Sequence, residues 1–224
     1  MIKEFNVTGK CNANRHYMAD VSHKLSDVIQ LVERGKYFII NRPRQYGKTT
    51  ILYNLTDALR KTGNYLVFNI SFEGIDDMDL DGERTFPSGF VRLLAKNMET
   101  FDRPNAALLS ALIPTVKSMN DLSDFITDLT SKTDKKVVVL IDEVDQSSNN
   151  ELFVKFLAML RNKYLARDET ATFHSIVLAG LHDVKTLKLK LRPDEERKYN
   201  SPWNIATDFK VDMNLFPAEI KPML

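Results

Sequence analysis

The sequence predicts an α/β fold in which a mostly parallel sheet lies between layers of helices. Two observations favour this fold. Short apolar, β-prone runs alternate along the chain with segments whose apolar residues recur at helical spacing, and this alternation is typical of parallel sheets. One of the runs, Val137–Ile141, is apolar without interruption, as expected of a central strand that helices cover on both faces.

The elements can be justified in order from the N-terminus. A helix is expected before the first strand, Tyr37–Asn41, which ends in a polar loop. The next helix is expected over Lys48–Arg60, where apolar residues follow helical spacing, and Gly63 ends it. The further expected elements are strands at Tyr65–Ile70, Val137–Ile141, Phe173–Ala179 and Phe209–Met213, and helices at Phe86–Phe101, Asp121–Leu129 and Asn150–Leu165.

The composition is that of an ordinary globular protein. The 224 residues are 43% apolar and 27% charged, with a formal net charge of +1, so no overall basic field argues for nucleic acid. The single cysteine, Cys11, cannot form an internal disulfide and has no metal-ligand spacing around it. No apolar run approaches the roughly 20 residues that span a bilayer, and the N-terminus lacks the pattern of a signal peptide. We therefore expect a cytoplasmic protein without a membrane segment.

The loop after the first strand carries the main functional signal. The segment Arg42-Pro43-Arg44-Gln45-Tyr46-Gly47-Lys48-Thr49 matches the end of the phosphate-binding pattern G-x-x-x-x-G-K-[ST] between a strand and a helix. The helix N-terminus directs free N–H groups at an anion. We expect Lys48 to reach the β- and γ-phosphates of a nucleotide, Thr49 to ligate Mg²⁺, and Thr50 to complete the loop. Arg42 stands where the general pattern has its first glycine.

A second signal lies about ninety residues further on, in the usual order for this type of site. Asp142 and Glu143 follow the apolar run Val137–Ile141, and ligands of parallel α/β sheets bind at the carboxyl ends of the strands. We expect Asp142 to hold Mg²⁺, directly or through water, and Glu143 to polarise an attacking water molecule. The two signals together predict an ATP-binding P-loop domain whose cofactors are ATP and Mg²⁺.

These residues carry a family resemblance that covers nearly the whole chain. The chain resembles the bacterial and archaeal AAA-like ATPase domains, which are relatives of the STAND and AAA ATPases. The segments that carry the resemblance are His16–Asp20, Tyr37–Thr50, Ile141–Asp145, Leu178–Asp183 and Ser201–Ala206. The family tolerates arginine in place of the first glycine.

The resemblance implies a three-layer P-loop NTPase with a five-stranded, mostly parallel sheet between helices, built from the strands expected above. It implies an ATPase core over residues 1–216, with 1–36 leading into it, and the start of a truncated helical lid at 217–224. It places a phosphate sensor at His182 or Asp183, and the adenine near His16, Tyr17 and Asp20. For these three residues, a surface cap is the alternative interpretation.

Several interpretations stay open at this point. Arg42 and Arg44 either add positive charge at the phosphates or face solvent, and Arg192 and Arg197 are candidate arginine fingers in a homo-oligomer. A basic stripe over 185–192 either contacts nucleic acid or a protein partner or is one solvated face. The main hypothesis is a Mg²⁺-dependent ATPase that works as a switch or motor module. Its rivals are a nucleotide-binding signalling or scaffold module with little hydrolysis, and a DNA-associated ATPase of a mobile element or defence system whose DNA-binding region follows residue 224.

Overall fold

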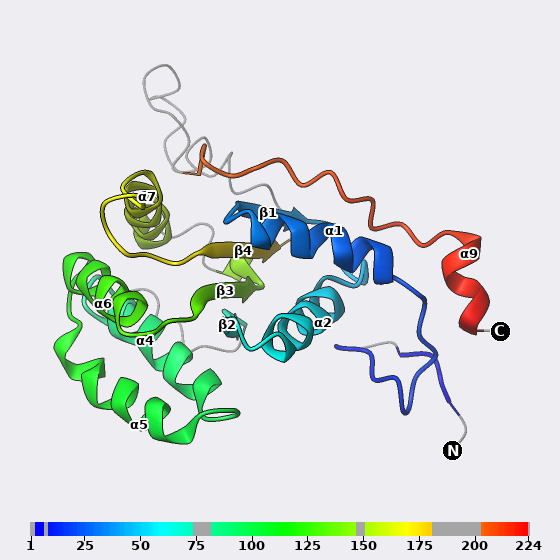
Figure 1. Ribbon diagram of the computed structural model, residues 1–224, viewed down its shortest axis with the longest axis horizontal. Coiled ribbons are helices and arrows are strands. Elements are labelled where there is room, and N and C mark those ends of the chain that lie inside the picture. The colour runs from blue at the N-terminus through cyan, green and yellow to red at the C-terminus, as the bar shows by residue number, and fades with distance from the viewer. Residues whose placement is uncertain (1–2, 7–8, 74–81, 147–150, 181–202, 224) are drawn as a thin grey trace.

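A parallel sheet organises the described part of the chain. The computed structural model describes residues 3–6, 9–73, 82–146, 151–180 and 203–223. Within these ranges the sheet has four strands in the order β1-β4-β3-β2 (Figure 1), and all three pairings are parallel. The strands are β1 (Tyr37–Asn41), β2 (Tyr65–Ser71), β3 (Lys136–Asp142) and β4 (Ser175–Gly180). The expected α/β fold with a parallel sheet is therefore confirmed.

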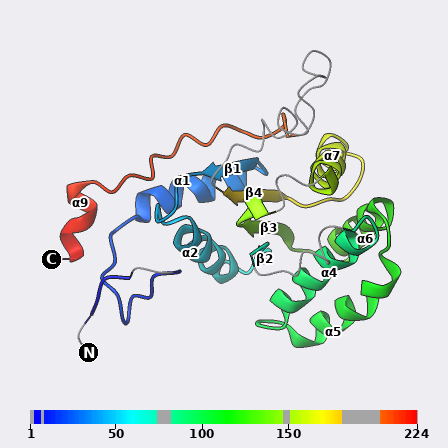
Figure 2. The same ribbon diagram turned by 180° about the vertical axis from the view of Figure 1, so that it is seen from behind.

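Helices cover both faces of this sheet, as Figure 1 and the view from behind in Figure 2 show. One layer consists of α1 and α2, and the other is built from α4, α5, α6 and α7. The bounds of the helices are α1 (Ser22–Glu33), α2 (Lys48–Lys61), α4 (Thr85–Met98), α5 (Arg103–Leu112), α6 (Met119–Ser131), α7 (Glu151–Leu165) and the short α9 (Pro217–Ile220). In the described part of the chain, 3₁₀ turns cover Ile113–Thr115, Val144–Gln146 and Lys221–Met223.

The alternation of side chains along the strands divides the core between the two layers. In β1, Tyr37 and Ile39 pack with α4–α7, while Phe38 and Ile40 pack with α1 and α2, because successive strand residues point to opposite faces. Every residue of Val137–Ile141 in β3 is buried, which agrees with its continuous apolar sequence. The two helical layers therefore hold the strand ends in a fixed arrangement.

The prediction of a fifth strand at Phe209–Met213 is wrong, since the sheet of the described residues does not include this segment. This segment runs in extended form beside the free edge of β1, but only an isolated bridge joins them, between Phe38 and Thr207. The Thr207 N–H donates to the Tyr37 carbonyl at 2.8 Å, and no strand ladder follows in this part of the structure. Side chains replace the ladder, since the rings of Phe209 and Phe38 stack with centroids 5.9 Å apart.

The helix α5 was not expected from the sequence. Six of its ten residues are apolar but only Ala106 and Leu109 are buried, so its apolar residues do not gather on one buried face as those of a regular amphipathic helix do. Its start nevertheless has a readable signal. The Asp102 side chain accepts a hydrogen bond from the Asn105 N–H at 3.2 Å and a proline occupies the first turn, which is a favoured way to begin a helix.

Candidate functional site

The two sequence signals meet at the carboxyl edge of the sheet. The loop Arg42–Thr49 leaves β1, and Asp142 ends β3, with β4 lying between these two strands. The Thr49 hydroxyl, on the first turn of α2, donates a hydrogen bond to Asp142 Oδ2 at 2.7 Å. The fold thus brings together two side chains that are 93 residues apart in the sequence.

The loop has the backbone shape of a phosphate cradle. Gly47 has a φ of 74°, in the left-handed region that favours glycine. An added Cβ there would meet nothing within 4 Å, so the backbone conformation and not crowding calls for glycine. Gln45 also has a positive φ, of 63°. The Gly47 carbonyl accepts the Ile51 N–H at 2.9 Å, which starts α2 with its N-terminus directed at the loop.

Lys48 is buried at the base of this loop. Its Nζ donates to the carbonyl oxygens of Arg42 at 2.9 Å and Pro43 at 3.1 Å, while residues 43–47 are exposed. The ammonium group therefore lies within the loop, at the level of its first residues. A cation in this position can bind an anion that sits on the exposed N–H groups of the loop.

The Thr49–Asp142 pair fits two adjacent corners of a magnesium site. Oxygen ligands at adjacent corners of an Mg²⁺ octahedron lie about 2.9 Å apart, because Mg–O bonds are about 2.0–2.1 Å, and these two oxygens are 2.7 Å apart. Mg²⁺ in such sites is usually held by one or two carboxylates together with water and substrate phosphates. Across the described ranges no group of three or more His, Cys, Asp or Glu could hold a metal, so this pair is the relevant candidate.

Glu143 has an unusual backbone and a perturbed carboxyl group. Its φ is 52°, a conformation that concentrates at functional sites when it occurs outside glycine. Its N–H donates to Asp142 Oδ1 at 3.0 Å. Burial raises the pKa of the Glu143 carboxyl, the charge of Asp142 raises it further, and Lys48 opposes the rise. A carboxylate with a raised pKa is suited to accept a proton from water.

A cavity of about 440 Å³ lies beside the loop. Its wall is formed by the N-terminal segment, by the loop and the start of α2, and by the C-terminal segment. The lining residues are Asn6, Cys11, Tyr17, Met18, Ala19, Val21, Lys24, Gln45, Tyr46, Gly47, Thr50, Ile51, Met213, Asn214, Leu215 and Met223. A cavity with this mixed apolar and polar lining can take a flat heterocycle next to a phosphate site.

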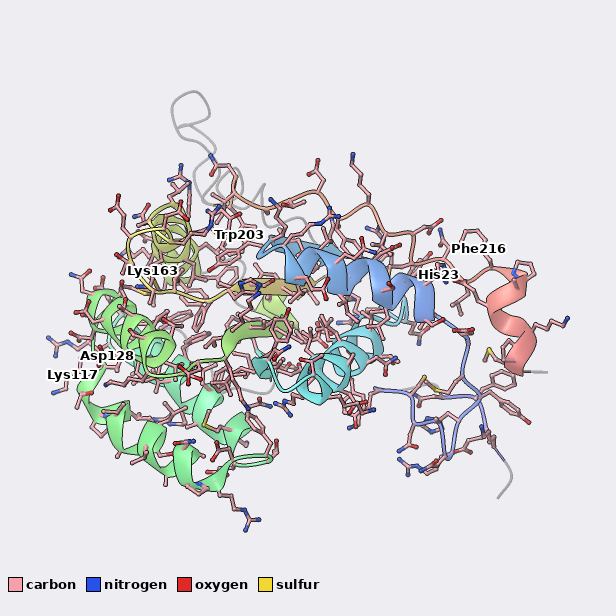
Figure 3. The ribbon with its side chains drawn as sticks, in the orientation of Figure 1. His23, Lys117, Asp128, Lys163, Trp203 and Phe216 are labelled. Carbon is pink, nitrogen blue, oxygen red and sulfur yellow. The ribbon has the colours of Figure 1, made fainter. Side chains whose placement is uncertain are left out.

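A buried ion pair closes the C-terminal side of this cavity. Lys24 Nζ lies 2.8 Å from Glu219 in α9 and also donates to the Asn214 carbonyl. His23, which Figure 3 labels with Phe216, is 3.2 Å from the same carboxylate. The Asp20 N–H donates to the Glu219 carbonyl at 2.8 Å. The chain around α9 is thereby fixed to the start of α1.

A larger cavity, of about 910 Å³, lies elsewhere, along the free edge of β2 between α4 and α5. Its lining includes Ser71, Glu73, Lys96 and Arg103 but no residue of the loop Arg42–Thr49. Volume alone does not identify the site, because the positively charged loop and the acid pair lie at the smaller cavity and the adjoining strand ends.

Comparison with known proteins identifies the family of this chain. The family model described as predicted AAA-ATPase matches residues 54–189, which is more than half of the chain. The chain belongs to this AAA-ATPase-like family. The match contains Asp142 and Glu143 but begins after the loop Arg42–Thr49, so the loop rests on its own sequence and geometry.

One solved structure shows the same fold at low identity, and the chain spans about half of that protein's length. A Walker-type ATPase of Pyrococcus abyssi is 14% identical with a TM-score of 0.56, covering 92% of this chain and 56% of its own. The ORC2 protein of Aeropyrum pernix, in ADPNP and ADP complexes, is 11% identical with a TM-score of 0.46, covering 87% of this chain and 47% of its own. The Drosophila ORC bound to DNA and Cdc6 is 12% identical with a TM-score of 0.44; the match covers 78% of this chain and 26% of the ORC chain. No curated protein matches the chain.

The remaining candidates from the sequence have different outcomes. His182, Asp183, Arg192, Arg197 and the stripe 185–192 lie outside the described residues. Tyr17 lines the cavity beside the loop, whereas His16 accepts the Asn12 N–H on Nδ1 and Asp20 accepts the Ser22 N–H. Arg44 is exposed. None of the described helices is long and apolar enough to cross a membrane.

Sequence reasoning missed most of the cavity wall. Cys11 reaches it because its N–H donates to the Thr50 hydroxyl at 3.2 Å. Met213–Leu215 reach it because Lys24 and Glu219 fix the C-terminal segment against α1. Both contacts join parts of the chain that are far apart in sequence, and no local pattern announces them.

Proposed function

We propose that this AAA-ATPase-like chain binds ATP with Mg²⁺ and hydrolyses it to ADP and inorganic phosphate, as a switch or motor module. The observation that carries the proposal is the 2.7 Å contact between Thr49 and Asp142. It joins the loop with the left-handed Gly47 to the acid pair after β3. A chance Gly-Lys-Thr triplet has no reason to lie against a buried carboxylate at the carboxyl edge of a parallel sheet.

The residues divide the work by their positions. The exposed N–H groups of the loop and the Lys48 ammonium bind the phosphates. Thr49 and Asp142 hold Mg²⁺, which when bound supplies positive charge to the phosphate oxygens. The cavity lined by Tyr17 and Met213 takes the adenine. The chain around Pro217–Ile220 is proposed to be the start of a helical lid, and residues 1–216 are proposed to be the ATPase core.

Glu143 is proposed to act as the general base. It takes a proton from a water molecule whose oxygen then bonds to the γ-phosphorus, while the bond from that phosphorus to the ADP oxygen breaks. The proton rests on the Glu143 carboxyl and the electron pair leaves with ADP. The raised pKa of this carboxyl brings its proton affinity closer to what the step requires.

Two variants, compared with wild type, test the proposal. We expect wild type to bind ATP and release phosphate with Mg²⁺, Lys48→Ala to lose binding, and Glu143→Gln to bind ATP while turning over at least about 100-fold more slowly. Calorimetry measures binding and phosphate release measures turnover. Lys132→Ala and Glu83→Gln are matched controls, because both side chains are exposed and lie in surface ion pairs.

The outcomes separate the parts of the proposal. Absence of ATP binding by wild type at millimolar concentration would refute the nucleotide site. Binding without turnover in wild type would favour the rival reading, a nucleotide-binding module with little hydrolysis. Equal turnover by Glu143→Gln and wild type would remove Glu143 from the mechanism while leaving the binding site intact.

A further inference from the structure

The arginine that replaces the first glycine of the loop has a specific set of contacts. Arg42 Nη1 donates to the Asn41 carbonyl at 2.9 Å, and Nη2 donates to the Val211 carbonyl at 3.2 Å. The guanidinium carbon also lies 5.6 Å from the centroid of the Phe209 ring. The side chain is half-buried and is occupied by the C-terminal segment. It therefore neither faces solvent freely nor points its donors at the phosphate loop.

The segment that Arg42 holds has few other attachments to the sheet. The Thr207 N–H bonds to β1, and Phe209 stacks on Phe38 in β1. Further along the segment, the Arg42 guanidinium donates a hydrogen bond to the Val211 carbonyl. In a fifth strand, this carbonyl would have bonded to the main chain of β1 instead. The next residues, Met213–Leu215, line the cavity beside the loop. The position of this cavity wall thus depends on the Arg42 side chain, through the chain that leads into the wall, as well as on the contacts of Lys24 with Asn214 and Glu219.

The backbone of the same residue belongs to the phosphate loop. The Arg42 carbonyl accepts the Lys48 Nζ at 2.9 Å, and the Arg42 N–H donates to the Gly180 carbonyl at 3.2 Å. One residue is therefore fixed to the phosphate-binding lysine through its main chain and to the cavity wall through its side chain.

We propose that Arg42 is a positioning residue that sets the distance between the phosphate loop and the C-terminal wall of the cavity, and so determines how strongly the nucleoside part of the ligand is bound. The inference rests on the proposed function, since the cavity is taken to hold the base of ATP. Two neighbouring sites linked in this way bind a ligand that spans both better than either half, because the link removes the freedom of one site relative to the other.

This role predicts a different result from a direct phosphate contact. An arginine at the phosphates contributes equally to ATP and to inorganic tripolyphosphate, which have the same phosphate chain. An arginine that positions the wall contributes to ATP alone. A guanidinium that donates to two main-chain carbonyls and to the Asn41 side-chain oxygen is also not replaced by an ammonium, which is a compact charge without the planar fork.

The test measures binding of Mg²⁺-ATP and Mg²⁺-tripolyphosphate by calorimetry. For Arg42→Ala we expect ATP to bind about 10-fold more weakly, the loss of a hydrogen bond from a charged donor, while tripolyphosphate stays within about 2-fold. Arg42→Lys should restore little of the ATP affinity. Phe209→Leu should give a smaller loss of about 3-fold for ATP alone and provides a second variant if Arg42→Ala unfolds.

Arg167→Ala is the matched control. Arg167 donates to the Tyr164 carbonyl at 2.8 Å and lies 4.0 Å from the Tyr164 ring centroid, the same two kinds of contact, but just beyond the C-terminal end of α7. It should leave both affinities unchanged. Equal losses for ATP and tripolyphosphate, no loss for either, or full rescue by Arg42→Lys would each overturn the positioning role. Failure of wild type to bind ATP would instead refute the proposed function, and the inference with it.

Discussion

Replacing Gly180 with alanine should damage the acid pair through packing. An added Cβ at this residue, the last of β4, would lie 2.6 Å from Asp145 Oδ2 and 2.9 Å from Val144 Cγ2. Carbon atoms pack at about 3.5–4.0 Å, so Val144 would have to move by about 0.6 Å or more. Val144 is fully buried and cannot rotate away freely. Overpacking of this kind typically lowers the free energy of unfolding by about 1–3 kcal/mol.

The displacement reaches the proposed general base directly. Val144 opens the 3₁₀ turn Val144–Gln146 and follows Glu143, whose backbone is already in the left-handed region. Because misplacement by about 1 Å can slow catalysis about 100-fold, we expect Gly180→Ala to hydrolyse ATP roughly 10- to 100-fold more slowly. Its affinity for Mg²⁺-ATP should change little, since the atoms nearest to the added methyl group belong to Val144 and Asp145 and not to the phosphate loop, Asp142 or the cavity wall.

Urea denaturation and phosphate release under saturating ATP measure the two effects in one preparation. Gly63→Ala is the control: its φ is 76° and an added Cβ would meet nothing within 4 Å, so it should lose about 1–2 kcal/mol through backbone strain alone and keep its turnover. If Gly180→Ala lost stability but hydrolysed ATP at the wild-type rate, the link from β4 to Glu143 would be refuted.

Three further predictions concern pH and the sheet edge. Burial, followed by the charge of Asp142, raises the pKa of Glu143, so the charged form of this side chain destabilises the fold at higher pH. Glu143→Gln should therefore have a higher Tm than wild type at pH 7. This gain in Tm should vanish below about pH 4, where the wild-type carboxyl is protonated in both the folded and the unfolded chain. The hydrogen bond from Lys24 lowers the pKa of Glu219, so Glu219→Gln should have a lower Tm at pH 7, and the difference should shrink as acid protonates the wild-type carboxylate; a constant difference would contradict the role of this ion pair. Asn97→Ala removes two hydrogen bonds, of 3.1 and 2.7 Å, to the main chain at the free edge of β2; urea denaturation should show a loss of about 1–2 kcal/mol, and unchanged stability would show that water replaces them without cost.

The predictable parts of this molecule are those with local patterns. The apolar run Val137–Ile141 indicated β3 because burial on both faces requires apolar residues throughout. The sequence pattern of the loop Arg42–Thr49 predicted a tight turn at a helix start, which the left-handed Gly47 before α2 bears out, while its role as an anion site stays a prediction. The acid pair followed from the position of Asp142 at the end of a buried strand.

The parts that failed depend on contacts between distant segments. The alternation in Phe209–Met213 suggested a strand, but Phe209 stacks on Phe38 and Val211 bonds to a side chain, so the same alternation supports a different attachment. The cavity wall likewise depends on Lys24 and Glu219, which are 195 residues apart. A charged residue gives no indication in the sequence of which distant partner it will meet.

The departure from the general pattern at Arg42 follows from the same reasoning about the backbone. Among the non-glycine residues of the described chain, only Gln45 and Glu143 have a positive φ. The strained positions of the loop are therefore 45 and 47, and a side chain at position 42 costs no backbone strain. A first glycine is needed only where a side chain would block the phosphates. Here the Arg42 guanidinium contacts the Val211 carbonyl and the Phe209 ring and so lies away from the phosphate loop. The pattern is thus relaxed at the position where the C-terminal segment provides a partner, and it is kept at Gly47, where no neighbouring contact could relieve the left-handed backbone.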